Sequence, residues 1–352
     1  MLKINNKIIS YSKKPFFIAD IAANHNGSLN KARDLIHQCA EAGADAAKFQ
    51  HFTASTIVSD YGFKKLNKIK SHQSDWKKSV YDVYKYAEVN FEWINELKKT
   101  CKDAGIFFFS TPYSLEYIDK LDKYMSAYKI GSGDITWIEA IIKIAKKNKP
   151  ILLATGASDL KDIARAIKNI KKYHNKIVLM QCNTNYTGDL KNFNYINLNV
   201  LKTFRKKYSS LTLGLSDHTP GHSTVLGAIT LGARVIEKHF TDNVNNNGPD
   251  HKFSMTPSTW RTMIDRSNEL FISLGSENKT IEKNEKESVI VQRRSIRASK
   301  DLKKGDKINK EDLVFLRPCP IDALNPYDYP KILNKKLNKN IVKGDTITLN
   351  DL

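Results

Sequence analysis

Eight short apolar runs, each ending in polar or ionisable residues, constrain the fold of this chain more than any other feature. From residue 15 to about residue 275 they alternate with amphipathic stretches of helical period. The runs are FFIAD (16–20), DAAKF (45–49), IFFFS (106–110), AYKIG (127–131), PILLAT (150–155), KIVLMQ (176–181), LTLGLS (211–216) and RVIEKH (234–239). Eight strand–helix repeats over about 260 residues predict an α/β fold, the (β/α)8 or TIM barrel.

A doubly wound open sheet is the main alternative for such an alternation. It would usually carry a glycine-rich phosphate-binding loop after the first strand. That position here has the sequence IAANHNGS, with a single glycine. The barrel is therefore our prediction, with helices expected in segments 29–43, 91–105, 137–148 and 160–174.

The pattern changes after residue 275. We interpret the charged segment 276–292, which has no aromatic residue or proline, as a linker between a barrel domain, 1–275, and a second domain, 293–352. The second domain contains an internal repeat, DLKKGDKINKEDL (301–313) and NIVKGDTITLNDL (340–352). Each copy predicts a short strand, a glycine turn and a short strand, so we expect a small β-rich module.

Composition narrows the class of protein. The 352 residues are 41% hydrophobic, and no run approaches the roughly 18 apolar residues that span a bilayer. The N-terminus lacks the apolar core of a signal peptide, and the four cysteines are far apart, so we predict a cytoplasmic protein without membrane attachment. The net charge of +20 comes mostly from scattered lysines, which favours solvated helix faces over a nucleic-acid surface.

Polar residues at the strand ends should converge, because active sites of barrel enzymes lie at the C-terminal ends of the strands. In chain order the eight ends carry Asp20 with Asn24 and His25; Lys48 and Gln50; Ser110 and Thr111; Lys129, Ser132 and Asp134; Thr155; Asn183, Thr184 and Tyr186; Ser216, Asp217 and His218; and Glu237 with His239.

Lys48 and Lys129 lie inside otherwise apolar runs. A lysine at a sheet edge, or one whose amine reaches solvent, is the simpler interpretation of each alone. Two such lysines on nearby strands, with Thr111, Ser132 and Ser216 beside them, favour a pocket for a phosphate or carboxylate group.

His218 and His239 end two strands that are consecutive in the chain, and Asp250 follows shortly after. Each histidine alone is more often part of a core. Two neutral imidazoles at adjacent strand ends suit a divalent ion such as Mn²⁺, Co²⁺ or Zn²⁺, and such an ion could polarise a substrate carbonyl.

Several motifs in order identify a family resemblance: ADIAANHNGSL, KFQHF, FSTP, AYKIGSGD, GLSDHT, IEKHFT and GPDHKFSM. Together they resemble the sialic acid synthase family, and RRSIRASKDLKKGD resembles that family's antifreeze-like SAF (β-clip) domain. The resemblance covers nearly the whole chain. It implies a transferase of nonulosonic acid and cell-surface polysaccharide biosynthesis, which condenses phosphoenolpyruvate with an open-chain N-acetylated hexosamine and releases phosphate.

The resemblance also implies roles for individual residues. Phosphoenolpyruvate would be held by Lys48, Lys129, Thr111, Ser132 and Ser216; the sugar would face Gln50, Tyr186 and Asp250; and a divalent metal, Mn²⁺ first with Co²⁺ or Mg²⁺ as alternatives, would be held by His218 and His239. Asp134 would also belong to the substrate-binding residues. Asp20 would lie close to the reacting carbons. Glu237 would orient the catalytic His239, and Lys238 should point outward because side chains alternate along a strand.

Arg317, in FLRPCP, is implied to reach the partner subunit's barrel in a domain-swapped homodimer. The alternative is that Arg317 holds a local carboxylate such as Asp322. Departures from the family pattern are Asp20 and Asp134 in place of Glu, Ala154 in ATG, the order CNTNYTG, and RPCP.

These departures leave the acceptor open between N-acetylmannosamine and a 2,4-diacetamido-6-deoxyhexose, while IGSGD argues weakly against the pseudaminate branch. Two other functions stay as alternatives: a metal-dependent barrel aldolase that uses a keto acid, and, on charge alone, a nucleic-acid-binding protein.

Overall fold

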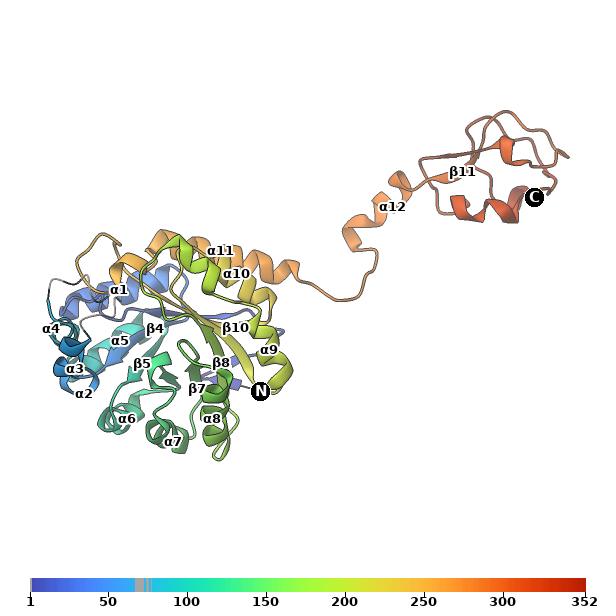
Figure 1. The fold of residues 1–352 in the computed structure, drawn as a ribbon. Helices are drawn as coiled ribbons and strands as arrows, with labels where there is room; N and C mark the ends of the chain where they lie inside the picture. The colour runs from blue at the N-terminus through green and yellow to red at the C-terminus, as the bar shows by residue number, and fades with distance from the viewer. Residues whose placement is uncertain (1, 67–72, 74–75, 77) are drawn as a thin grey trace. The chain divides into compact units, whose positions relative to one another are not determined.

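The computed structural model describes residues 2–66, 73, 76 and 78–352 (Figure 1). The chain divides into two compact units, Met1–Gly275 and Ser276–Leu352. Each unit is described by itself below.

The first unit is built on eight parallel strands in the order β5-β4-β3-β10-β9-β8-β7-β6, and contact between β5 and β6 nearly closes this sheet into a barrel. The strands are β3 Phe16–Asp20, β4 Ala46–His51, β5 Phe107–Pro112, β6 Tyr128–Ile130, β7 Ile151–Ala154, β8 Ile177–Cys182, β9 Thr212–Asp217 and β10 Ala233–His239. All eight predicted strands are present within one or two residues, and the predicted α/β barrel is confirmed.

Helices surround the sheet (Figure 1). They include α1 Leu29–Glu41, α5 Ile94–Asp103, α6 Leu115–Leu121, α7 Ile138–Lys146, α8 Leu160–Lys171, α9 Val200–Lys207, α10 Ser223–Thr230 and α11 Pro257–Ser273. The spacing in α8 shows why they form: it buries Ile163, Ala166, Ile167 and Ile170, a single face of a helix, and its N-cap Asp159 accepts from two backbone N–H groups.

Side-chain alternation divides the barrel lumen into two zones. In β3, Phe16 and Ile18 belong to an apolar cluster that also contains Leu2 and Ile4 of the N-terminal hairpin, β1 Leu2–Ile4 and β2 Lys7–Ile9. Asp20 is two residues beyond Ile18, so it faces the same lumen at the opposite end of the strand. The apolar zone therefore supports a polar zone at the carboxyl ends of the strands.

The connection between β4 and β5 is long and carries several short helices: α2 Ala54–Ile57, α3 Asp60–Lys65, α4 Val80–Tyr86 and the 3-10 turn η2 Phe91–Trp93. The repeating sequence pattern did not predict α2, α3 or α4, whereas η2 lies at the start of the helix predicted over 91–105. They matter below because α4 brings side chains to the polar end of the lumen.

The second unit contains α12 Lys286–Gln292 and an antiparallel pair, β11 Ser295–Ala298 and β12 Leu313–Leu316. The two repeats pair with each other: Leu302 and Ile341 exchange backbone hydrogen bonds of 2.8 and 2.9 Å, and Gly305 and Gly344 turn with φ near +90°. The predicted second strand of each copy is wrong in part. Each copy closes with a 3-10 turn, Lys310–Asp312 and Leu349–Asp351, because an acidic side chain there caps the preceding backbone.

Within the described ranges, no helix is long and apolar enough to cross a membrane.

Candidate active site

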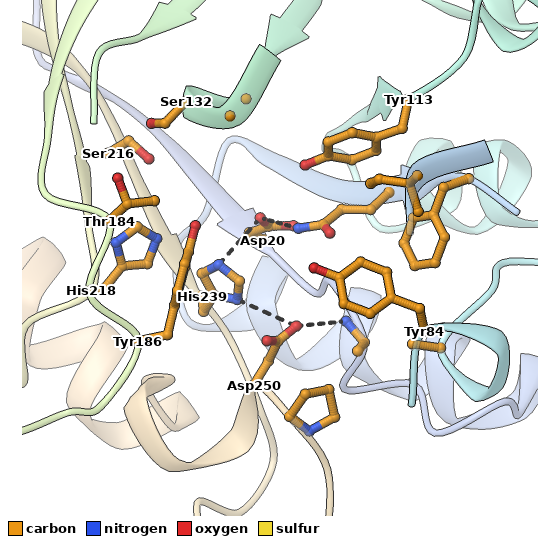
Figure 2. Close-up of a pocket in the computed structure, with 18 of the residues that line it drawn as sticks. Asp20, Tyr84, Tyr113, Ser132, Thr184, Tyr186, Ser216, His218, His239 and Asp250 are labelled. Carbon is orange, nitrogen blue, oxygen red and sulfur yellow. Dashed lines mark hydrogen bonds and ion pairs between the residues drawn. The ribbon is translucent and has the colours of Figure 1, made fainter. Parts of the chain in front are cut away.

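A cavity of about 390 Å³ opens at the carboxyl ends of the strands (Figure 2). Twelve of the residues assigned to the site from the sequence line it: Asp20, Lys48, Gln50, Lys129, Ser132, Asp134, Tyr186, Ser216, His218, Glu237, His239 and Asp250. They come from strands distributed around the barrel and from the segments that directly follow these strands, so closure of the sheet is what gathers residues more than 200 positions apart.

Asp20 lies at the centre of one group of contacts. Its carboxylate is 2.6 Å from the ammonium of Lys48 and accepts a hydrogen bond of 3.1 Å from Gln50. Lys48 donates to the Thr111 hydroxyl at 3.3 Å, which places Thr111 beside the cavity wall. Burial alone would raise the pKa of Asp20, but Lys48 and then His239 lower it, so the carboxylate stays ionised.

Glu237 organises a second group. Its Oε1 accepts from Lys129 at 2.9 Å and from the Ser216 hydroxyl at 3.1 Å, while its buried Oε2 has no hydrogen-bond partner among the described residues. The prediction that Glu237 orients His239 is therefore wrong. Lys129, on β6, lies across the lumen from β10 and binds the Glu237 carboxylate. The carboxylates near His239 are instead Asp20, at 3.5 Å, and Asp250, at 3.9 Å.

His218 and His239 come together as predicted, with ring centroids 5.4 Å apart. Nδ1 of His218 is 2.9 Å from the carbonyl oxygen of Asn183. Burial alone would lower the pKa of His218, but a hydrogen bond with Cys182 and the contact with Asn183 raise it. Burial lowers the pKa of His239 despite Asp20 and Asp250, so its imidazole is neutral. Its Nδ1 has no hydrogen-bond partner in the part of the chain that the structure describes. Tyr186 stacks edge-on against His218 at 4.4 Å.

Ser132, Gly156 and Thr184 lie close together just after β6, β7 and β8. The Gly156 N–H donates to the Ser132 hydroxyl at 3.0 Å, and no described residue forms a hydrogen bond with the buried hydroxyl of Thr184. A Cβ at position 156 would be 2.3 Å from the Thr184 hydroxyl, so only glycine fits. Thr184 was noted at its strand end but not assigned to the site.

Other strand-end residues do not reach the cavity. Asn24 donates to the Phe240 carbonyl, Ser110 to the Phe49 carbonyl and Thr155 to the Met180 carbonyl. These hydrogen bonds make them part of the barrel frame.

Lys238 leaves the lumen, as alternation predicts, but it does not reach solvent. It is 1% exposed, pairs with Asp217 and donates to the Thr219 carbonyl at 2.6 Å. Asp217 also accepts from the hydroxyls of Thr219 and Thr224, at 2.8 and 2.7 Å, which ties β9 and β10 to α10.

Arg317 belongs to the second unit and is exposed. Among the described residues, no ion pair includes it, so the alternative pairing with Asp322 is not seen. Its role in a partner's barrel stays a prediction.

Sequence patterns missed the residues of one cavity wall. Phe52, Ile57, Val83 and Tyr84 come from the connection between β4 and β5, and Tyr113 follows β5. Extending the strand alternation from Thr111 by two residues would have found Tyr113. No local pattern marks Tyr84, because only the tertiary fold brings α4 over the lumen.

The cavity lining contains more carboxyl groups than lysines, although the chain as a whole has a net charge of +20. Two lysines, Lys48 and Lys129, face four carboxyl groups, Asp20, Asp134, Glu237 and Asp250, in this lining. Burial raises the pKa of Asp134 to about 6, so this carboxyl is mostly ionised at neutral pH. A divalent cation bound here would offset the excess of carboxyl groups and so favour binding of an anionic substrate.

Fold and cavity together define a barrel protein with paired lysines and paired histidines at one mouth. A model of the NeuB family matches residues 35–279, and a model of the SAF domain matches residues 293–352. The chain therefore belongs to the NeuB family, and the resemblance found in its sequence is confirmed.

Known proteins agree with this assignment. The chain is 35% identical to an N,N'-diacetyllegionaminic acid synthase of Campylobacter jejuni, over 95% of this chain and 99% of that protein. It is 32% identical to a pseudaminic acid synthase of the same species, over 96% and 97%. A crystal structure of N-acetylneuraminic acid synthetase from Leptospira borgpetersenii, in complex with citrate, is 26% identical with a TM-score of 0.71, covering 82% of this chain and 94% of that one.

Proposed function

We propose that this protein condenses phosphoenolpyruvate with an open-chain N-acetylated hexosamine to form a nonulosonic acid, with release of phosphate. The observation that carries this proposal is the meeting of Lys48 and Lys129 with His218 and His239 in one cavity of a NeuB-family chain. The named acid synthases among its relatives support it.

Phosphoenolpyruvate binds at the lysine side of the cavity in this proposal. Lys48 and Lys129 supply two ammonium groups, and the hydroxyls of Thr111, Ser132 and Ser216 supply neutral donors for a phosphate or carboxylate. Each ammonium pairs with a carboxylate in this structure and has three N–H donors, so it can donate to the substrate as well.

The reaction forms a bond between C3 of phosphoenolpyruvate and the aldehyde carbon of the sugar. Water adds at C2, and the bond between C2 and the phosphate oxygen breaks. We assign Asp20 the proton that this water loses, because its carboxylate is ionised and lies between Lys48 and His239.

His218 and His239 fit a divalent metal, for which we propose Mn²⁺ first and Co²⁺ or Mg²⁺ as alternatives. His218 is oriented by the Asn183 carbonyl, His239 is neutral, and the surrounding carboxylates offset added positive charge. Such an ion would polarise the aldehyde oxygen. Within the described part of the chain, no cluster of three or more His, Cys, Asp or Glu side chains suits a metal, so the protein would supply the two imidazoles of His218 and His239.

Gln50, Tyr186 and Asp250 would face the acceptor, and both N-acetylmannosamine and a 2,4-diacetamido-6-deoxyhexose remain candidates. A panel of these sugars with phosphoenolpyruvate and Mn²⁺, assayed for released phosphate, tests the proposal. A keto-acid aldolase would consume pyruvate and release no phosphate.

We further propose that Arg317 completes the partner's site in a homodimer. Inactive dimers of His239→Ala and of Arg317→Ala should regain activity when their subunits exchange, since one barrel of the mixed dimer then has both intact residues. If each barrel uses its own Arg317, no activity returns. A cytoplasmic location also stays a prediction, and cell fractionation tests it.

A further inference from the structure

The two ends of the barrel carry different charge. At the cavity end, the segments that join strands β6 to β10 to their following helices contain two lysines and five aspartates: 131–137, 155–159, 183–199, 218–222 and 240–256. At the opposite end, the segments that lead from α7, α8 and α9 into the next strands contain four lysine or arginine residues each and no carboxylate: 143–150, 168–176 and 202–211. The N-terminal hairpin segment 2–15 likewise has four lysines and no carboxylate.

We propose that these four segments, which we call the basic face, bind the surface of a membrane that contains anionic phospholipids. The protein would lie on the membrane without crossing it, and the cavity at the other end of the barrel would stay open to substrates. The prediction of a protein without membrane attachment rested on the absence of an apolar span, and it did not consider where the lysines lie in the fold.

The basic face is one continuous surface. The strands β7, β8 and β9 are neighbours in the sheet, so the segments that lead into them lie side by side. The Lys176 ammonium donates to the Asn148 carbonyl at 2.9 Å, which joins the segments before β7 and β8. The Tyr11 ring centroid lies 3.9 Å from the Arg205 guanidinium, and the Tyr11 hydroxyl donates to the Leu211 carbonyl at 3.4 Å, which joins the hairpin to the segment before β9.

Most of the positive charge on the basic face is available to a partner. Four of its lysines pair with Asp45, Asp119 or Asp122. Within the described residues, the remaining lysines and Arg205 form no ion pair, and all of these remaining lysines are exposed. An anionic surface could therefore contact them without breaking existing pairs.

Large apolar and aromatic side chains lie exposed among these lysines. Ile8 is 44% exposed next to Lys7 on the hairpin, and Tyr173 is 43% exposed directly after two lysines at the end of α8. Apolar or aromatic groups flanked by lysines are typical of proteins that bind membrane interfaces, because the ammonium groups contact lipid headgroups while the apolar groups enter the boundary with the acyl chains.

The composition of the basic face favours a membrane over a nucleic acid. Its single arginine is Arg205, which stacks on Tyr11, and all its other cationic residues are lysines. Nucleic-acid surfaces usually combine arginine with aromatic rings that stack on bases. Lysine is a point charge on a flexible stem, which suits a surface whose charges are spread and mobile. Each lysine close to an anionic membrane contributes about fivefold to affinity.

Cosedimentation of the intact protein with lipid vesicles tests the proposal. At about 0.15 M salt the protein should bind vesicles of phosphatidylcholine mixed with phosphatidylserine but not vesicles of phosphatidylcholine alone, and added salt should weaken binding. Affinity should fall at least about tenfold when four exposed lysines of the basic face are replaced together, since several fivefold contributions are lost. The combined changes are Lys171→Gln, Lys172→Gln, Lys206→Gln and Lys207→Gln.

A matched control separates the basic face from the net charge of the chain. It removes the same charge from four exposed lysines elsewhere on the barrel unit: Lys78→Gln, Lys85→Gln, Lys161→Gln and Lys191→Gln. This variant should bind the mixed vesicles nearly as tightly as wild type. An equal loss of affinity in both variants would overturn the proposal, because net charge alone would then explain binding.

A fluorescent label tests which end of the barrel meets the lipid. All four cysteines are buried, so a cysteine introduced at an exposed position takes the label selectively. A polarity-sensitive dye on Tyr173→Cys should shift to shorter wavelength when mixed vesicles are added, whereas the same dye on Lys161→Cys, at the start of α8, should not. A shift at Lys161→Cys alone, or at neither position, would contradict the proposed orientation.

A nucleic-acid partner is the outcome that would replace a membrane. Single-stranded RNA should not displace the protein from mixed vesicles at the same salt concentration. Binding to this RNA without binding to the mixed vesicles would reject the proposal and make the basic face a nucleic-acid surface. These measurements need no turnover, so their failure would leave the proposed function untouched, and a failure of phosphate release would leave the basic face untouched.

Discussion

Strands β9 and β10 carry charged groups on both faces, and the two faces differ in how fully their polar atoms are satisfied. On the lumen face, Glu237 binds Lys129 and Ser216 through one carboxylate oxygen. Among the described residues, neither its other oxygen nor Nδ1 of His239 has a hydrogen-bond partner. On the outer face, Asp217 accepts from Lys238 and two threonine hydroxyls, and Lys238 also binds a carbonyl.

This contrast separates binding from framework. A buried polar atom without a partner costs about 1–3 kcal/mol, so folding alone would not favour it. The lumen face keeps such atoms next to a cavity, where a ligand can satisfy them. On the outer face, none of these groups has an unpaired polar atom, and their contacts hold β9, β10 and α10 together. We therefore expect lumen substitutions to damage function and outer substitutions to damage stability.

The largest effect is expected at the histidines. His218→Ala or His239→Ala should reduce turnover about a thousandfold, because a lost metal contact removes several kcal/mol of transition-state stabilisation. Both variants should keep the thermal unfolding midpoint of wild type within a few degrees. Mn²⁺ titration followed by electron paramagnetic resonance should show weaker binding, and unchanged Mn²⁺ affinity in both would reject these ligands.

Lys238→Met should have the opposite profile. It leaves Asp217 buried without its counter-charge, so the free energy of unfolding should fall by about 3–5 kcal/mol, measured by urea denaturation. The KM for phosphoenolpyruvate of the folded protein should stay the same. Asp217→Leu combined with Lys238→Met should recover part of the lost stability. A stable Lys238→Met variant with impaired substrate binding would break the contrast.

The lysines of the lumen should give an intermediate effect on binding. Lys129→Met removes the charge but keeps most of the side-chain volume. Loss of a charge-assisted hydrogen bond costs roughly 1.5–3 kcal/mol, so affinity for phosphoenolpyruvate should drop about ten- to a hundredfold, as should that of Lys48→Met. Lys120→Met, which alters an exposed ion pair with Glu116 on α6, should bind normally in the same calorimetric titration.

Asp134 should give the smallest effect, and one that depends on pH. Its pKa in the folded protein is about 6, above its usual value of 3.8, because burial disfavours the charge. The folded protein therefore binds more protons between these values, and stability falls as pH rises from about 4 to about 6. Relative to wild type, Asp134→Asn should gain about 1 kcal/mol across this window, since Asp134 is partly exposed. Identical pH profiles for the two proteins would show that Asp134 is not buried in this way.

The sequence was sufficient for the frame and for much of the lumen. Strand alternation put Asp20, Lys48 and His239 on lumen positions because period-two geometry is local. The sequence was insufficient where contacts cross the barrel. Lys129 on β6 binds Glu237 on β10, and the spacing of residues within β10 does not predict this ion pair. It also failed for Tyr84, which reaches the cavity from an irregular connection whose path depends on tertiary packing.

The fate of the bridging oxygen of phosphoenolpyruvate tests the central claim most directly. Phosphoenolpyruvate labelled with oxygen-18 between C2 and phosphorus is incubated with the protein, Mn²⁺ and the acceptor panel, and the products are analysed by mass spectrometry. Carbon–oxygen cleavage predicts that the label appears in released phosphate, together with a nine-carbon acid whose C2 oxygen comes from water. Label retained in the organic product, or no phosphate released with any acceptor, would contradict the account.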